Sequence, residues 1–126
     1  MLNVEWFNNK QKESALTIYY NNITFSKQTT MLFNNAYGII VGIDRDTEQL
    51  VFKKVTQEEI ENEKYYHEDI YKLTIKPTYG RINSRQLVNN ICKYFNLDFT
   101  NKVSYKFSAI WNNGYNMLIV NIKGGE

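Results

Sequence analysis

The chain has 126 residues, of which 43% are hydrophobic and 15% aromatic, with one Pro and six Gly. This length is typical of one domain and suffices to bury about two-thirds of the surface of the unfolded chain. The net charge is +2, from 15 basic and 13 acidic residues. That balance permits nucleic-acid binding but lacks the basic excess with which dedicated nucleic-acid binders neutralise phosphates. We therefore expect a single domain, residues 1–126, without a linker or low-complexity tail.

Cys92 is the single cysteine, so no intramolecular disulfide can form, which suits a reducing compartment. The first residues lack a basic region followed by an apolar run, so we expect no signal peptide. No stretch approaches the roughly 20 apolar residues that a membrane-spanning helix requires. The expected location is the cytoplasm.

The first half of the chain, residues 15–55, predicts two hairpins with a short helix between them. Residues 15–20 and 23–25 are rich in β-formers, and Asn21-Asn22 can adopt the positive φ of a tight turn. Ser26 can cap a helix from Lys27 to about Phe33. Alternating apolar residues then predict strands over 37–43 and 50–55, joined by a polar turn.

An acidic connector, residues 56–69, follows the first half. Thr56 and Glu59 have the spacing of a capping box, and the helix that they open should run to about Lys64. This helix has few apolar positions, so we expect it to lie in solvent. Its carboxylates would repel DNA, so any contact with phosphates should lie on another face.

The second half, residues 70–123, repeats this order of elements. Strands are expected over 70–76, ended by Pro77, and over 79–82, and Asn83 or Ser84 can cap the next helix. That helix has one apolar stripe: Leu87, Val88, Ile91, Cys92 and Phe95. Alternation predicts one strand over 103–111, and Asn112-Asn113-Gly114 turns the chain into a last strand over 115–122.

The two halves also share a short sequence pattern. Residues 23–28, ITFSKQ, and residues 80–86, GRINSRQ, both lead from a strand into Ser, a basic residue and Gln at a helix start. The order of elements supports a repeat more than the identities do. We predict an α+β fold of two tandem strand–helix–hairpin units, about 15–55 and 70–123, with mainly antiparallel sheet around one shared core.

A short strand, a capped helix and a β-hairpin form the plan of the AbrB/SpoVT-type swapped-hairpin module, which this sequence resembles in tandem. It is similar to small uncharacterised proteins of Firmicutes and their phages. The stretches that carry the resemblance are residues 23–27, 37–44 and Arg81-Ile82-Asn83-Ser84.

The resemblance implies one intertwined body that presents basic side chains to double-stranded DNA. Carried over by position, the contact residues would be Lys27, Arg81 and Arg85, with three further lysines as neighbours: Lys53, Lys54 and Lys76. A regulatory DNA-binding module is the first hypothesis. The alternative is a phage or mobile-element module that keeps the fold and binds a protein, as an inhibitor or accessory factor. A monomer and a homodimer both remain open.

Lys27 and Arg85 occupy equivalent places near helix starts. They could hold phosphates beside free backbone N–H groups, or they could be ordinary solvated charges. Six aromatic residues could form a stacking platform for single strands, but Lys102 and Lys106 should lie on the face opposite Tyr105 and Phe107, so core packing is preferred. The six are Tyr19, Tyr20, Tyr105, Phe107, Trp111 and Tyr115.

No constellation of catalytic or metal-binding residues is evident in the sequence. His67 is the single histidine, and we expect it on the surface. The carboxylates of residues 44–48 fit a turn better than a calcium loop. Cys92 belongs to the apolar stripe and is expected in the core. We therefore predict a binding protein without a cofactor or metal rather than an enzyme.

Overall fold

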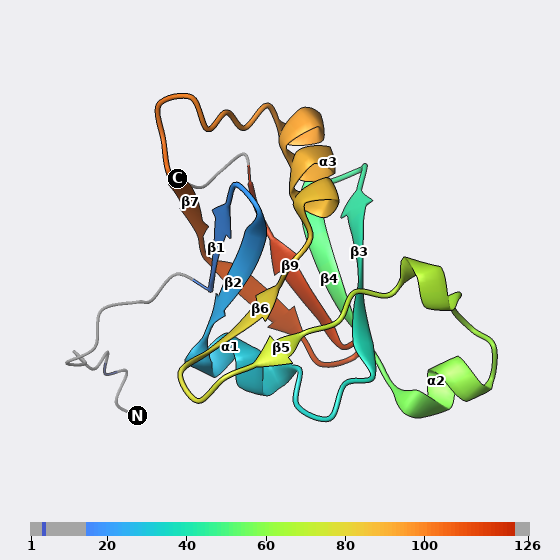
Figure 1. The fold of residues 1–126 in the computed structure, drawn as a ribbon. Helices are drawn as coiled ribbons and strands as arrows, with labels where there is room; N and C mark the ends of the chain where they lie inside the picture. Colours follow the sequence, from blue (N-terminus) through green and yellow to red (C-terminus); the bar gives the residue numbers. More distant parts are fainter. Residues whose placement is uncertain (1–3, 5–14, 123–126) are drawn as a thin grey trace.

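The computed structural model describes Val4 and residues 15–122, so Trp6 and Phe7, which could have covered an edge or a partner surface, lie outside the described residues. Two antiparallel sheets, A and B, and short helices enclose one core (Figure 1). This confirms the predicted α+β class with mainly antiparallel sheet. Among the described helices, none has the length and apolar character needed to cross a membrane.

Sheet A has five strands in the order β5-β6-β2-β1-β7, and sheet B has four in the order β3-β4-β9-β8. The strands of sheet A are β1 (Leu16–Tyr19), β2 (Asn22–Ser26), β5 (Thr74–Ile75), β6 (Tyr79–Ile82) and β7 (Ser104–Phe107). The strands of sheet B are β3 (Gly38–Asp44), β4 (Gln49–Val55), β8 (Ala109–Asn112) and β9 (Met117–Val120).

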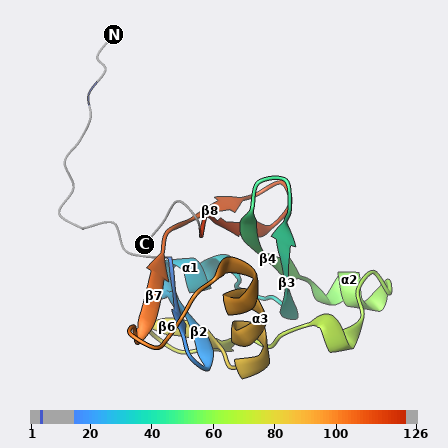
Figure 2. The ribbon, with the colours of Figure 1, turned by 90° about the horizontal axis from the view of Figure 1, so that it is seen from above.

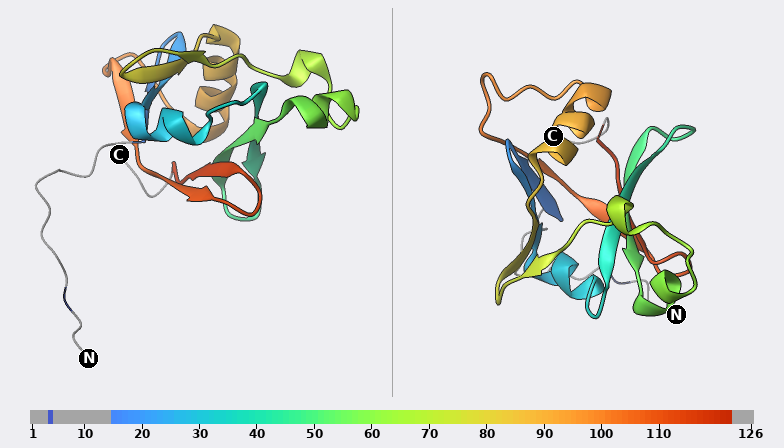
Figure 3. Two further views of the ribbon diagram at one scale, coloured as in Figure 1. Left: turned by 90° about the horizontal axis from the view of Figure 1, so that it is seen from below. Right: turned by 45° about the vertical axis from the view of Figure 1, so that its right-hand side comes forward.

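Two helices lie at opposite ends of the space between the sheets, α1 (Lys27–Leu32) and α3 (Arg85–Phe95) (Figures 1 and 3). A serine caps each helix. Ser26 Oγ accepts a hydrogen bond from Thr29 N, as predicted, and Ser84 Oγ, one of two predicted caps, accepts one from Leu87 N. The acidic connector holds α2 (Gln57–Glu61), which begins with the predicted capping box, and a 3₁₀ turn over His67–Asp69. This connector extends away from β1 and β7 (Figures 1 and 2).

The two sheets are joined at two places. Strands β7 and β8 follow one another across Ser108, so one stretch of chain ends sheet A and begins sheet B. On the other side, the backbones of Ile39 in β3 and Tyr71 exchange two hydrogen bonds, at 2.9 and 2.7 Å. The described core residues therefore form one connected cluster.

Strand pairs connect the two halves at the centre of both sheets. β2 pairs with β6 in sheet A, and β4 pairs with β9 in sheet B. In each half the order is hairpin, helix, hairpin, and each half contributes one hairpin to each sheet. The halves differ in β7, which adds a strand to sheet A and has no counterpart in the first half. Apart from β7 the arrangement is the one that two copies of one unit would give, and the duplication itself stays a prediction.

Four predicted elements differ from the structure. The last strand, expected over 115–122, spans Met117–Val120, because the turn before it extends over residues 113–116. The strand expected over 70–76 is reduced to Thr74–Ile75, because Tyr71 pairs with β3 of the other sheet instead. The strand expected over 103–111 is broken at Ser108 where it changes sheets. The connector helix ends at Glu61 rather than near Lys64, since Asn62 is its C-cap and Glu63 has a φ of 55°.

The apolar stripe of α3 covers the core. Leu87, Val88, Ile91 and Phe95 are buried as predicted, whereas Cys92 is half-buried. Ile91 is 3% exposed, so a charge at this position would be removed from water without a partner.

We expect Ile91→Asp to lower the free energy of unfolding by about 3 kcal/mol or more, because the carboxylate would be buried among apolar side chains. Urea denaturation followed by circular dichroism measures the change. Asn90→Asp is the matched control, because Asn90 is the exposed neighbour on the same helix. Equal stability of the two variants would contradict the placement of α3.

Gly80 marks a close approach between sheet A and α1. A Cβ atom here would lie 2.7 Å from Thr30 Cγ2 and 2.8 Å from Thr30 Oγ1. Thr30 cannot move easily, because it is buried and its hydroxyl donates to the carbonyls of Phe25 and Ser26.

Gly80→Ala should therefore destabilise the protein by about 1–3 kcal/mol through overpacking. Gly42→Ala serves as the control, because a Cβ atom at Gly42 would meet no described atom within 4 Å. Thermal unfolding of both variants tests the idea, and a Gly80→Ala variant as stable as Gly42→Ala would refute the close packing.

Candidate nucleic-acid interface

Charge is segregated between the strands of sheet A and the rest of the described chain. Residues 15–28, 70–89 and 101–108 supply this sheet and its flanking turns, and they contain no Asp or Glu. The same segments contain Lys27, Lys72, Lys76, Arg81, Arg85, Lys102 and Lys106. The described carboxylates lie in the β3–β4 turn, in the connector and in the loop after α3. The charged residues within these three segments of the chain are thus all cations.

Strand register places polar side chains in one row across the outer face of sheet A. Alternate residues of a strand point to opposite faces, and Ile18, Ile23, Phe25, Ile82 and Phe107 fill the core. The residues between them face outward and pair across the sheet. The central row is Thr74, Arg81, Thr24, Thr17 and Lys106.

Arg81 lies in this row on β6, next to the central strand β2, and one of its hydrogen-bond donors is unpaired among the described residues. Its guanidinium lies over the Tyr79 ring, 5.0 Å from the centroid. Its Nε is shielded from solvent and has no hydrogen-bond partner within the described part of the chain. An unsatisfied buried donor costs free energy. Because this atom is shielded, a phosphate could contact Arg81 only through the other nitrogens of the guanidinium.

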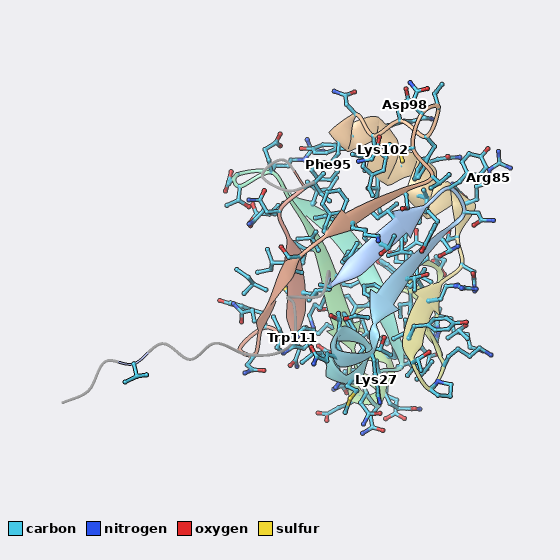
Figure 4. All side chains as sticks on the ribbon, turned by 90° about the vertical axis from the view of Figure 1, so that its left-hand side faces the viewer. Lys27, Arg85, Phe95, Asp98, Lys102 and Trp111 are labelled. Carbon is cyan, nitrogen blue, oxygen red and sulfur yellow. The ribbon has the colours of Figure 1, made fainter. Side chains whose placement is uncertain are left out.

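The other cations lie around the edges of the sheet. Lys27 is exposed at the start of α1, at one end, and Arg85 and Lys102 lie at the other end (Figure 4). Lys76 is exposed in the β5–β6 turn, and Lys106 is exposed on β7. Among the described residues, none of these side chains takes part in an ion pair.

Four of the six residues expected to contact DNA therefore border sheet A, and two do not. Lys53 and Lys54 lie on β4 of sheet B. The ammonium group of Lys53 is 3.3 Å from the carboxylate of Glu59 and lies over the Tyr65 ring. The positive charge of Lys53 is thus paired with a carboxylate, and the structure does not bring Lys53 together with the cations of sheet A.

A cation and an aromatic ring are combined at the end of sheet A nearest α3. The guanidinium of Arg85 lies 4.5 Å from the centroid of Tyr20 and donates a hydrogen bond to its hydroxyl group. Tyr20 belongs to the two-residue turn between β1 and β2 and is half exposed. The Arg85 side chain is thereby held at the edge of the sheet instead of extending freely into solvent.

An open groove of about 570 Å³ begins beside Tyr20, between α3 and the loop over residues 97–103. Tyr20 and Phe99 line it edge to face, with ring centroids 6.2 Å apart, and Tyr105 packs behind Phe99 with its centroid 5.4 Å away. The ammonium group of Lys102 lies 4.5 Å from the centroid of Tyr105. The groove thus combines aromatic surface with positive charge.

Asp98 is the carboxylate that lines this groove. Hydrogen bonds from the hydroxyl and backbone N–H of Thr100 hold the pKa of Asp98 below its ordinary value, so it is ionised at neutral pH. The Tyr105 hydroxyl donates to the backbone carbonyl of Asp98, at 2.6 Å, and fixes the loop. The groove therefore has a fixed shape and both signs of charge.

The expectation that the aromatic residues pack in the core is partly wrong. Phe107 is buried and Tyr105 and Trp111 are half-buried, but Tyr19, Tyr20 and Tyr115 are exposed. Lys106 does lie on the face opposite Phe107, as predicted. Lys102 does not lie opposite Tyr105, because it precedes strand β7 and does not follow the alternation of the strand.

Lys72, Lys102 and Lys106 were not among the expected contact residues. Whole-chain charge conceals them, since the acidic connector offsets the basic segments. The detectable signal is the absence of Asp and Glu from residues 70–89 and 101–108, combined with the prediction that these residues form strands. A charge count for each segment would have found them.

The other candidates have structural roles. His67 is exposed, and its Nδ1 lies 3.1 Å from the Tyr37 hydroxyl. The Asp44 carboxylate accepts hydrogen bonds from Asp46 N and Thr47 N, which is the expected turn chemistry. Within the described ranges, no group of three or more His, Cys, Asp or Glu is placed to hold a metal ion.

No protein-family model, curated protein sequence or solved structure matches this chain.

Cys92 lines the groove but is a weak nucleophile. Burial raises the pKa of its thiol, and the negative charge of Asp98 raises it further. Because the thiolate is the reactive form, a raised pKa leaves less of it at a given pH.

At pH 8 we expect iodoacetamide to modify Cys92 several-fold more slowly in the folded protein than in urea, where the thiol regains its ordinary pKa. Mass spectrometry of timed samples measures both rates. Asp98→Asn should speed the reaction of the folded protein, because one source of the pKa shift is removed. Equal rates for folded and unfolded protein would show that the thiol is not shielded.

Proposed function

We propose that this protein is a non-enzymatic module that binds nucleic acid, double-stranded DNA included, through the outer face of sheet A. The observation that carries the proposal is the segregation of charge, which leaves this sheet with cations and no carboxylate in its strands. Phosphate contacts supply most of the sequence-independent affinity for nucleic acid. A surface on which every charge is positive supplies them without internal repulsion of the phosphates.

The spacing of the cations suits a nucleic-acid backbone. Arg81 on β6 and Lys106 on β7 are separated by three strand intervals, or about 14 Å. The major groove of DNA is about 12 Å wide. Two cations at this separation can reach phosphates on both sides of a groove, while Thr17 between them supplies a hydroxyl group.

The position of the acidic residues supports the same face. The connector, which carries most of the described carboxylates, extends away from β1 and β7 (Figure 3). A polyanion is repelled by that side and attracted to sheet A. A net charge of +2 is therefore compatible with a strongly basic face.

An AbrB-like ancestry is part of this proposal. The repeated order of hairpin, helix and hairpin, with both halves contributing to both sheets, supports it. The contact residues that we propose differ from those carried over by resemblance, since Lys53 and Lys54 are replaced by Lys102 and Lys106.

Binding of a labelled duplex of random sequence should be detectable at low salt and should weaken steeply as salt is added. Lys76→Glu with Lys106→Glu should lower the affinity about ten-fold or more and flatten the salt dependence, because two phosphate contacts become repulsive. Fluorescence anisotropy across a salt series measures both quantities.

The matched control is Lys64→Glu with Lys93→Glu. Both are exposed cations outside sheet A, and the pair changes the net charge by the same amount. Equal loss of affinity in the two double variants would show that overall charge, and not this face, attracts the duplex.

The second candidate function, a protein-interaction module, is favoured by the outer face of sheet B. Its central row is apolar and consists of Gly42, Val51, Ile119 and Ile110. Ile110 is 73% exposed, and a shallow groove of about 340 Å³ lies beside this row. Apolar sheet surface of this kind suits a protein partner. If no nucleic acid is bound at low salt, this candidate replaces the first.

A further inference from the structure

The groove beside Tyr20 is built differently from the flat face of sheet A. Its walls are α3 on one side and the loop over residues 97–103 on the other. Its volume of about 570 Å³ is within the range of small-molecule sites. Val103 on its rim is 85% exposed, and Leu97 and Phe99 contribute further apolar surface. This apolar hollow therefore opens at the edge of a cationic sheet.

The chemistry of the groove matches that of a nucleobase. Exposed aromatic rings such as Tyr20 offer stacking surface, and every base has an aromatic face. Arg85 and Lys102 lie over Tyr20 and Tyr105, where they can contact the phosphates on either side of a stacked base. Asn89 and the carboxylate of Asp98 line the same groove and can accept hydrogen bonds from a base edge.

Access to the groove distinguishes paired from unpaired bases. In a duplex the faces of the bases are covered by their neighbours, and extruding one base costs a few kcal/mol. A base in a single strand is free to leave its neighbours and stack on a side chain. The groove can therefore be filled at little cost by a single strand.

We propose that the groove between α3 and the 97–103 loop binds an unpaired base, so that this protein prefers single-stranded nucleic acid to the duplex of the same sequence. This proposal rests on the proposed function, since the cations of sheet A hold the phosphates of the strand whose base enters the groove. Tyr19, exposed on the outer face of β1 next to Tyr20, provides a second ring along the path of the strand.

The test compares a short labelled single strand of mixed sequence with the duplex that it forms with its complement, at one salt concentration. Tyr20→Ala should weaken binding of the single strand about ten-fold, because a stacking ring is lost, and should leave duplex affinity within about two-fold. Tyr20→Phe keeps the ring but loses the hydroxyl that Arg85 contacts, so it should bind the single strand like the unmodified protein.

Two further variants guard against indirect effects. Val103→Asp places a negative charge in the groove at an exposed position, so it should weaken single-strand binding without unfolding the protein. Tyr115→Ala removes another exposed tyrosine, from the β8–β9 turn of sheet B, which does not line the groove, and should have no effect. Thermal unfolding of each variant verifies that the fold is retained.

The outcomes separate this proposal from the proposed function. Suppose that duplex binding depends on Lys76 and Lys106, while Tyr20→Ala and Val103→Asp leave single-strand binding unchanged. This result would overturn the proposal of a base-binding groove and would support the basic face. An equal affinity of the unmodified protein for the two forms also overturns the groove. Failure to bind either form at low salt overturns both proposals.

Discussion

Strands β2 and β6 run side by side at the centre of sheet A, and the hydrogen bonds between them hold the two halves of the chain together. β4 and β9 form the corresponding pair in sheet B. Each half on its own would expose an unpaired strand edge and half of the apolar core in both sheets. Gly80 shows how closely the halves fit, because its missing side chain leaves room for Thr30 of the other half. Every surface feature of the protein depends on this central pairing.

Much of the fold could be predicted from local patterns. Ser26, Ser84 and Thr56 cap helices where the sequence placed caps, and the strand over residues 79–82 has the predicted bounds. Local patterns did not show that the strand through Ser108 passes from one sheet to the other, since its alternation of buried and exposed residues continues across the break. The pairing of Tyr71 with Ile39 was equally invisible, because the two residues are distant in sequence and belong to different hairpins.

The candidate site could also be predicted only in part, because its residues come from segments that are distant in sequence. Lys27, Arg81 and Arg85 were expected from the resemblance, with Lys53, Lys54 and Lys76 as neighbours. Lys27, Lys76, Arg81 and Arg85 do border one sheet. Lys53 and Lys54 belong to β4 of the other sheet, which the resemblance did not indicate. The groove depends on the path of the 97–103 loop, and no local pattern fixes a path of that kind. Side chains that meet through loops are the hardest to predict.

The two ends of sheet A are unequal although the halves share an order of elements. One hairpin closes with Tyr20 and Asn21 beside α3, and the other closes with Pro77 and Thr78 near α1. An aromatic ring thus lies at one end, and at the other a small hollow is lined by Lys27, Lys76 and Pro77. Nucleic acid has a chemical direction, from 5′ to 3′. A strand laid across a surface with distinct ends would adopt one orientation, which a perfectly symmetric dimer of a single unit could not impose.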